Sequence, residues 1–379
     1  MNEYFAGAVR QLIRRSEHLL IRIKSGLSSE YHLLEKTCRE DLSGLIQELA
    51  QLINTPETHT ATNDTITIRT YRRLVGKLDE LETFVIPVLS RSHDDDRFLN
   101  RLVQQIRREI NYPLLPPVVS PFSQNYFYIL GEYNLICVPL EEGNFLLHLP
   151  DIYHEMAHPL EWAEGYPAIQ GFQISMIEFL DEAKSWLNEE LQREGSGRGG
   201  SELNKIYLRG WKRDWENWGR EFFCDIFATA TLGPAYAWSH FHLSAMRGGN
   251  PFDVPRLGVS THPADDARMR AILDALCICG FDEEAQEIET RWRELISALG
   301  FEPEPEYLRC YPTRIIKLLS EKALHGIRGM NCRIVTGETN DVVHRALNDA
   351  WRLFWIAPAD YAQQEGELIQ NLRRCVMSE

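Results

Sequence analysis

The chain has 379 residues, of which 44% are hydrophobic and 25% are charged, proportions typical of a folded globular protein rather than a disordered one. Its formal net charge of -15 at pH 7 repels phosphate backbones, which excludes nucleic acid as an expected partner. The sequence contains no run of about 18 apolar residues, so no membrane span is expected.

The compartment is indicated by the N-terminus and the cysteines. The first residues lack the basic region, apolar core and small-residue cleavage site of a secretory signal. Eight cysteines are scattered along the chain without a CxxC pair, as is typical of reduced thiols. We therefore expect a cytoplasmic protein.

Residues 1–113 have apolar residues at helical spacing throughout. A polar stretch at 55–65 separates two such helices from a second pair near 66–91 and 96–111. Four helices with short connections predict an antiparallel bundle. Paired arginines in this region indicate either a surface for a protein partner or an ordinary solvated helix face: Arg14-Arg15, Arg72-Arg73 and Arg107-Arg108.

A proline-rich segment at 111–122 predicts the end of the helical region. Two short apolar runs follow, at 126–130 and 134–140, and the glycine-containing connection between them predicts a β-hairpin. Pro139, near the end of the second run, predicts that this strand lies at the edge of its sheet. An extended peptide could then pair with it by β-addition.

Helices return from about residue 150 and continue to the C-terminus. A glycine-rich loop at 193–202 interrupts them, and we interpret it either as a lid or as a surface insertion. A final set of helices is expected at 305–379, where no chemically distinctive motif occurs.

The first helix of this region carries an HExxH motif, His154-Glu155-Met156-Ala157-His158. Residues four apart on a helix are rotated by only about 40°, so both imidazoles can bind one ion. Glu155 lies beside them, where it can act as a general base on a water at that ion. The alternative is an amphipathic helix with two histidines that only make hydrogen bonds.

A second segment, residues 216–234, predicts a helix that ends at Gly233-Pro234 and carries Glu221 and Asp225 on one face. Carboxylates among so many aromatic residues are costly to bury unless they are paired or bind metal. Glu221 is the expected third ligand of a catalytic Zn²⁺ that keeps one open position. Asp225 is expected to accept the other N–H of a ligating histidine. The alternative is that these carboxylates form ion pairs with Arg220 or Arg268.

HExxH followed by ExxxD on a second helix resembles the gluzincin metallopeptidases. A third segment, Thr261-His262-Pro263 followed by Arg268, is similar to the corresponding stretch of the CAAX prenyl endopeptidase and HtpX-like group. The resemblance covers roughly residues 125–280. It implies that His262 lies near the metal and donates a hydrogen bond to the oxyanion, and that Arg268 pairs with Asp225 or Glu221.

The position of His262 agrees with this role, because it precedes Pro263 at the expected start of a helix that ends near Gly280. A helix N-terminus disfavours the imidazolium, but a neutral ring still donates one N–H. The competing interpretation is that His262 only caps this helix. Tyr153, Tyr166 and His240 are further candidates for oxyanion contact.

Two features depart from that group. Its members are usually embedded in membranes, whereas no spanning segment is expected here. In addition, Pro159 directly follows His158 and is predicted to kink or stop the helix there.

Together, these observations predict a mainly α (α+β) protein in three parts. Residues 1–113 would form a helical bundle, and residues 114–300 a zincin-like metallopeptidase domain with a small β-hairpin or sheet. Residues 301–379 would form a C-terminal helical segment.

The expected activity is that of a zinc metalloendopeptidase acting on peptide or protein substrates, with Glu155 as general base. The alternative is a catalytically inactive or regulatory protein-binding module with a metallopeptidase fold, whose partner would bind the N-terminal bundle. A purely structural zinc is a third interpretation, but two histidines and one carboxylate leave a position open, as catalytic sites do.

Overall fold

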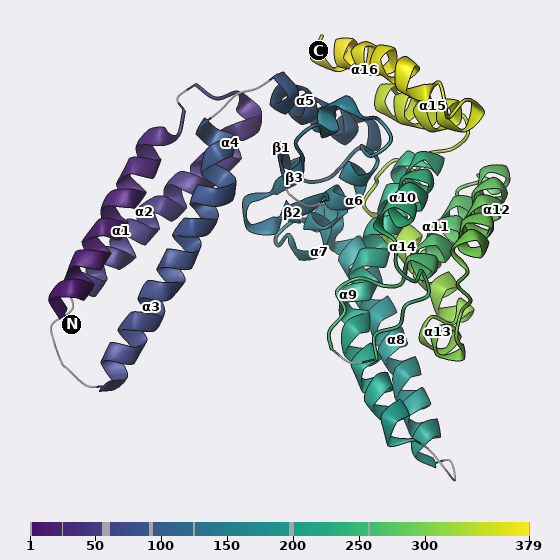
Figure 1. Ribbon diagram of the computed structural model, residues 1–379, viewed down its shortest axis with the longest axis horizontal. Helices are drawn as coiled ribbons and strands as arrows, with labels where there is room; N and C mark the ends of the chain where they lie inside the picture. Colours follow the sequence, from purple (N-terminus) through teal and green to yellow (C-terminus); the bar gives the residue numbers. More distant parts are fainter. Residues whose placement is uncertain are drawn as a thin grey trace. The chain divides into compact units, whose positions relative to one another are not determined.

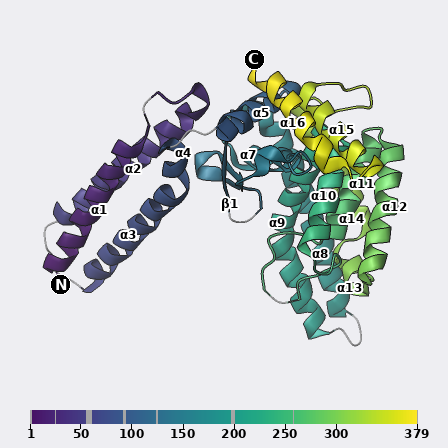
Figure 2. The ribbon, with the colours of Figure 1, turned by 45° about the horizontal axis from the view of Figure 1, so that its top comes forward.

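The computed structural model describes residues 2–24, 26–54, 61–90, 94–123, 126–196, 201–256 and 258–378. Within these ranges the chain is mainly helical and has one three-stranded sheet, which confirms the predicted fold class at this level (Figures 1 and 2). The chain forms two compact units, residues 1–100 with 117–140 and residues 101–116 with 141–379.

The first unit contains long amphipathic helices whose apolar faces form a common core. They are α1 (Asn2–Arg22), α2 (His32–Asn54), α3 (Ala61–Glu80), a π-helical turn (Leu81–Val85), α4 (Ile86–Ser90) and the start of α5 (Asp94–Ile110). Leu42, Leu45 and Leu78 are among its fully or almost fully buried residues. The helices predicted in this region are present, but the last of them, α5, is shared between the two units. Most of the polar stretch predicted at 55–65 lies outside the described residues.

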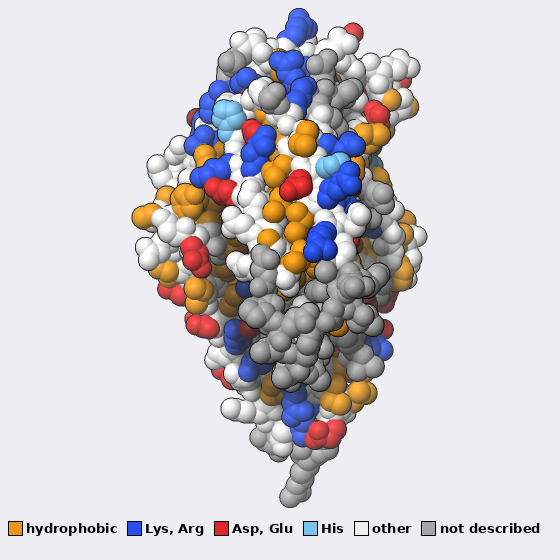
Figure 3. All heavy atoms as spheres, turned by 90° about the vertical axis from the view of Figure 1, so that its left-hand side faces the viewer, with side chains coloured by type: hydrophobic (Ala, Val, Ile, Leu, Met, Phe, Trp, Pro, Cys, Tyr) orange, Lys and Arg blue, Asp and Glu red, His pale blue; other side chains and the backbone are white. Residues whose placement is uncertain are grey.

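Two of the predicted arginine pairs, Arg14-Arg15 and Arg72-Arg73, lie on the helical surface of this unit, whereas Arg107-Arg108 belongs to the second unit. Figure 3 shows lysine and arginine side chains around exposed hydrophobic ones on one face of the molecule. Arg15 pairs with Glu82, and Arg73 pairs with Glu48. Arg14, Arg15 and Arg22 line a shallow cavity of about 600 Å³ along α1. A solvated face and a partner surface therefore both stay open as interpretations.

The sheet consists of β1 (Val118–Ser123), β2 (Tyr128–Leu130) and β3 (Leu135–Pro139), in the order β1-β3-β2. β2 and β3 are antiparallel, which confirms the hairpin, whereas β1 runs parallel to β3. The prediction that the strand at 134–140 lies at the edge is wrong, because β3 is central. Pro139 is its last residue, so the missing N–H affects only the end of the strand. Both sides of β3 are paired, and a substrate strand cannot be added there.

The sheet belongs with the N-terminal helices rather than with the predicted metallopeptidase domain. Val118, Leu135 and Cys137 are part of the same core as α1–α4. Asn100 links α5 to β1, because its amide accepts a hydrogen bond from Val119 N at 3.0 Å and donates to Val119 O at 2.8 Å. The compact units therefore group residues 117–140 with the N-terminal helices, and the division into the functional domains 1–113, 114–300 and 301–379 stays a prediction.

The second unit is helical. Its helices are α6 (Asp151–Ala157), α7 (Pro159–Trp162), α8 (Gln170–Ser196), α9 (Glu202–Leu232), α10 (Pro234–Arg247), α11 (Asp265–Ile278), α12 (Asp282–Leu299), α13 (Pro305–Cys310), α14 (Thr313–Gly329), α15 (Val342–Ile356) and α16 (Tyr361–Met377). α9 contacts α6, α8, α10, α11 and α14, so it is the central element. The segment at 301–379 is part of this unit and not a separate body.

The core around α9 is aromatic. Trp215 contacts Trp218 and Phe222 on the same face of α9. It also contacts Phe179 of the neighbouring helix α8. α9 ends at Leu232, directly before Gly233 and Pro234, as predicted. This core fixes the part of α9 that carries Glu221 and Asp225.

The glycine-rich loop connects α8 to α9, and its residues 197–200 lie outside the described residues. Its described end, Ser201, accepts a hydrogen bond from Asn204 N as the N-cap of α9. Because a helix rises 1.5 Å per residue, Ser201 lies roughly 30 Å from Glu221 along α9. The described flank of the loop is therefore remote from the predicted ligands, which favours the surface-insertion interpretation over the lid.

Candidate metal centre

The HExxH motif lies on α6, a short helix whose seven residues are all buried. The helix stops at Ala157, and α7 begins at Pro159, which confirms the predicted interruption. His158 lies between them with helical backbone angles (φ -53°, ψ -45°). His154 and His158 therefore stay one turn apart, with their ring centroids 5.1 Å from each other.

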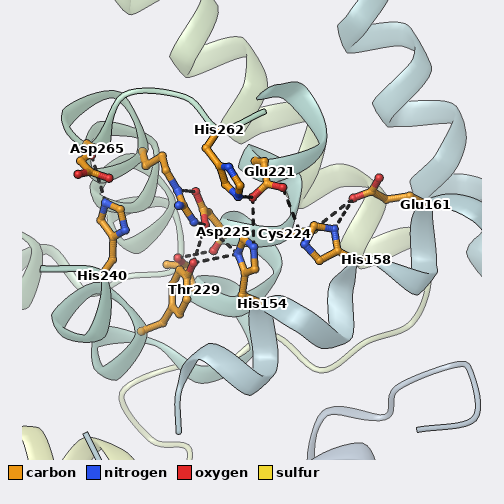
Figure 4. A network of polar contacts seen from close by, with 12 residues as sticks. His154, His158, Glu161, Glu221, Cys224, Asp225, Thr229, His240, His262 and Asp265 are labelled. Atoms are coloured by element: carbon orange, nitrogen blue, oxygen red, sulfur yellow. Dashed lines mark hydrogen bonds and ion pairs between the residues drawn. The ribbon is translucent and has the colours of Figure 1, made fainter. Parts of the chain in front are cut away.

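α9 places Glu221 opposite both imidazoles (Figure 4). His154 Nε2 lies 3.4 Å from Glu221 Oε2, and His158 Nε2 lies 4.0 Å from Glu221 Oε1. Glu221 Oε2 is buried and has no hydrogen-bond partner among the described residues. A buried carboxylate whose two oxygens each face an imidazole nitrogen is an arrangement that a metal ion would complete.

The spacing of these atoms can be compared with zinc geometry. Zinc ligands lie about 2.0–2.2 Å from the ion, so two ligands of a tetrahedral site are about 3.3–3.6 Å apart. The 3.4 Å separation of His154 Nε2 and Glu221 Oε2 has this value, and the 4.0 Å separation of His158 Nε2 and Glu221 Oε1 needs only a small adjustment. These two separations are compatible with ligation by His154, His158 and Glu221. Among the described residues, however, the group whose ligand atoms all lie within 4.8 Å of one another is His154, His158 and Cys224.

A second donor set competes with this one. His154, His158 and Cys224 have ligand atoms that all lie within 4.8 Å of one another. However, Cys224 Sγ lies 3.4 Å from His158 Nδ1, the ring nitrogen opposite to the one that faces Glu221. Burial raises the pKa of the Cys224 thiol well above its ordinary value, and Glu161 acts in the same direction, so the sulfur keeps its proton in the metal-free protein. Cys224 and Glu221 thus lie at opposite nitrogens of the His158 ring.

Asp225 occupies the other side of His154. Its Oδ1 lies 2.9 Å from His154 Nδ1, and Arg268 donates to both carboxylate oxygens at 2.6 and 2.8 Å. Tyr236 also donates its hydroxyl to Asp225 and lies 3.0 Å from His154 Nδ1. The predicted histidine contact and the alternative ion pair with Arg268 are therefore present together, whereas Arg220 lies near Glu161 instead.

The charges of this network favour an imidazolium in the absence of metal. Burial lowers the pKa of His154, but the carboxylates of Asp225 and Glu221 outweigh it and raise the pKa to about 10. Burial raises the pKa of Asp225, but Arg268 and His154 outweigh it and hold that pKa below its usual range. A metal ion at His154 must therefore displace a proton.

Glu155 is buried on α6 and forms no hydrogen bond with other residues of the described ranges. Burial raises its pKa, while the nearby His154 and His158 act in the opposite direction. A carboxylate whose pKa is moved toward neutrality and whose oxygens are unused has the properties of a general base.

His262 lies next to the centre but on its open side. Its Nε2 is 3.7 Å from Glu221 Oε2, and its side chain is 60% exposed. α11 begins at Asp265, after Ala264, and has no side-chain N-cap, so the interpretation of His262 as a helix cap is wrong, as is the expected helix start at Pro263. His262 lines a cavity of about 680 Å³ with aromatic walls that include Trp211, Phe252 and Tyr307.

The other oxyanion candidates do not converge on this centre. His240 Nε2 lies 3.1 Å from Asp265 O, Tyr153 is fully buried, and Tyr166 is 47% exposed in the turn after α7. Sequence reasoning missed Tyr236, Glu161 and Cys224. The sequence spacing places Glu161 three residues after His158, which is compatible with a contact on one helix face, but Pro159 predicted that the helix ends between them. No sequence pattern indicated the contact of Tyr236.

No family model, curated protein or solved structure matches this chain. Among the described residues, no helix is both long and apolar enough to cross a membrane. The sheet and the HExxH helix belong to different units, so a zincin-like arrangement of the two stays a prediction.

Proposed function

We propose that the chain is a zinc-dependent metallopeptidase whose ion is held by His154, His158 and Glu221. The observation that carries the proposal is the convergence of three buried side chains: Glu221 Oε2 lies 3.4 Å from His154 Nε2, and Glu221 Oε1 lies 4.0 Å from His158 Nε2. Asp225 supports it further, because a carboxylate on Nδ1 keeps the proton there and leaves Nε2 free to bind metal.

When zinc is bound, it supplies an acidified water and an electrophile that polarises the scissile carbonyl. Glu155 accepts the proton of the attacking water and passes it to the leaving amine. His262 donates an N–H toward the oxygen of the scissile carbonyl, where negative charge develops. Although the side chain is 60% exposed, desolvation and the nearby Arg268 lower the pKa of His262, which favours a neutral ring that keeps one N–H for this role.

The cavity beside His262 is large enough to hold part of a peptide substrate. Its volume of about 680 Å³ accommodates several side chains, and it opens to solvent through the exposed residues Asp253, Thr261 and Glu306.

The test measures zinc content by elemental analysis and cleavage of a peptide library by the native protein and by Glu155→Gln. We expect Glu155→Gln to retain zinc and to lose cleavage by a factor of about 10²–10⁴. Glu164→Gln, which replaces an exposed glutamate near α7, is the matched control and should cleave normally. A native protein without zinc, or one that binds zinc and cleaves nothing, would contradict the proposal; the second result would favour the protein-binding alternative.

The ligand set is tested by replacing zinc with Co²⁺. Ligation by His154, His158 and Glu221 predicts visible d–d bands without a thiolate-to-cobalt charge-transfer band in the near ultraviolet. Such a band, lost in Cys224→Ser, would instead identify the set that contains Cys224.

A further inference from the structure

Glu161 is a buried carboxylate for which the proposed reaction has no role so far. It lies on α7, one turn after His158, and its side chain is only 4% exposed. Its Oε1 lies 3.3 Å from His158 Nδ1 and accepts a hydrogen bond from Cys224 Sγ at 3.2 Å (Figure 4). Each histidine of the motif therefore has a carboxylate at Nδ1, Asp225 for His154 and Glu161 for His158.

The burial of Glu161 needs an explanation, because an ionised carboxylate is costly to remove from water without partners. Its only cationic partner in the described ranges is Arg220, at 3.8 Å and with a side chain that is 52% exposed. Such a half-exposed pair stabilises a protein little. The two contacts that are themselves buried are those with His158 and Cys224.

The contact between Glu161 and His158 Nδ1 helps to orient the His158 ring, because the backbone there is not part of a continuous helix. Because Pro159 has no N–H and interrupts the helix, His158 lies at a break between α6 and α7 rather than within a continuous helix. One face of its ring stacks on Trp162, with centroids 6.0 Å apart, but stacking alone does not fix which nitrogen carries the proton. Only a hydrogen bond at Nδ1 does so.

We propose that Glu161 is a positioning residue that accepts the Nδ1–H of His158 and so presents Nε2 to the metal, with Cys224 holding the carboxylate in place. This inference rests on the proposed metal site. The Cys224 thiol donates to the same oxygen, Oε1, that faces His158. Cys224 thus acts as a hydrogen-bond donor and not as a ligand, which accounts for its closeness to both histidines.

The experiment measures the zinc affinity of the full-length, metal-free protein by competition with a chromophoric chelator. We expect Glu161→Ala to weaken zinc binding by about 10–100-fold. Glu161→Gln should fall between this variant and the native protein, because its amide oxygen still accepts the Nδ1–H. Cys224→Ser, whose hydroxyl can still donate to Glu161, should bind zinc more tightly than Glu161→Ala.

Glu365 provides the matched control, since it is a buried carboxylate of the same unit that is bonded to Leu146 N and Tyr361. Glu365→Ala should leave zinc affinity unchanged. Equal affinity of Glu161→Ala and the native protein would overturn the proposal, as would equal weakening by Glu365→Ala. If Glu161→Ala does not fold, the zinc affinities of Glu161→Gln and Glu365→Gln are compared instead. Equal affinities of these two variants would overturn the proposal. Failure of the native protein to bind zinc would instead refute the proposed function itself.

Discussion

At the scale of single residues, the buried pair of Asp225 and Arg268 is the most consequential feature. Both side chains are almost completely buried, so each loses its hydration and depends on the other. Asp225 accepts from Arg268 twice and from Tyr236, and its Oδ1 also faces His154 Nδ1. Both of its oxygens accept hydrogen bonds, as the stability of a buried charge network requires.

We predict that Asp225→Asn weakens zinc binding by about 10–100-fold and destabilises the metal-free protein by about 3–5 kcal/mol. The first effect follows from the lost carboxylate at His154, and the second from a buried Arg268 without a counter-charge. Chelator competition and denaturant unfolding measure the two effects separately.

Asp214→Asn is the control for this prediction, because Asp214 lies on the same helix, is 1% exposed and pairs with the half-exposed Arg213. It should leave zinc affinity unchanged and cost less stability, since Arg213 remains hydrated. Weakening of zinc binding by Asp214→Asn to the same degree would show that disturbance of α9, and not the contact with His154, is responsible.

At the scale of elements, α9 combines an aromatic face with the face that carries Glu221 and Asp225, and neighbouring helices pack against it. α8 and α14 approach each other closely at Gly326, where an added Cβ would lie 2.9 Å from Phe172 Cα and 3.1 Å from Ser175 Cβ. Backbone atoms cannot move away as a flexible side chain can. The glycine therefore sets how closely α14 packs on α8, which in turn packs on α9.

We predict that Gly326→Ala destabilises the protein by about 1–3 kcal/mol through overpacking. Gly329→Ala on the same helix meets only Gly171 Cα at 3.9 Å and should be neutral or stabilising by up to about 1 kcal/mol. Thermal unfolding of the two variants measures the difference. Equal stabilities would mean that the contact at Gly326 relaxes without cost.

At the scale of the whole molecule, the unit that carries the site is built from two separate stretches of chain. Residues 101–116 contribute Tyr112, whose hydroxyl donates to Met156 O on α6 at 2.8 Å. They also contribute Glu109, which accepts from Val343 N and His344 N at the start of α15. The C-terminal half of α5 therefore supports both the HExxH helix and a C-terminal helix.

We predict that a fragment of residues 141–379 unfolds at a lower temperature and binds zinc more weakly than a fragment of residues 101–379, although both contain every proposed ligand. The shorter fragment loses the hydrogen bond to Met156 O and leaves the first N–H groups of α15 without Glu109, each change costing about 1 kcal/mol or more. Circular dichroism during heating and chelator competition measure the two effects. Identical behaviour of the fragments would show that residues 101–116 are dispensable.

Much of the candidate site was predictable because its signals are local. The four-residue spacings of His154 with His158 and of Glu221 with Asp225 place each pair on one face of a helix wherever that helix lies. The apolar patterns likewise predicted the helices, the hairpin and the end of α9 at Gly233. The residues of the proposed general base and ligands could therefore be singled out before any contact was known.

The pairings between distant segments, in contrast, were decided only by the tertiary structure. Which carboxylate faces which ring nitrogen, the contact of Tyr236 with Asp225, the position of Cys224 beside Glu161, and the central place of β3 depend on how separate elements pack. The packing of the sheet on the N-terminal helices also depends on contacts between distant segments, which no periodic pattern in the sequence predicts. Helical periodicity is set by backbone geometry within a few residues, whereas packing partners are chosen by burial and charge across the whole chain.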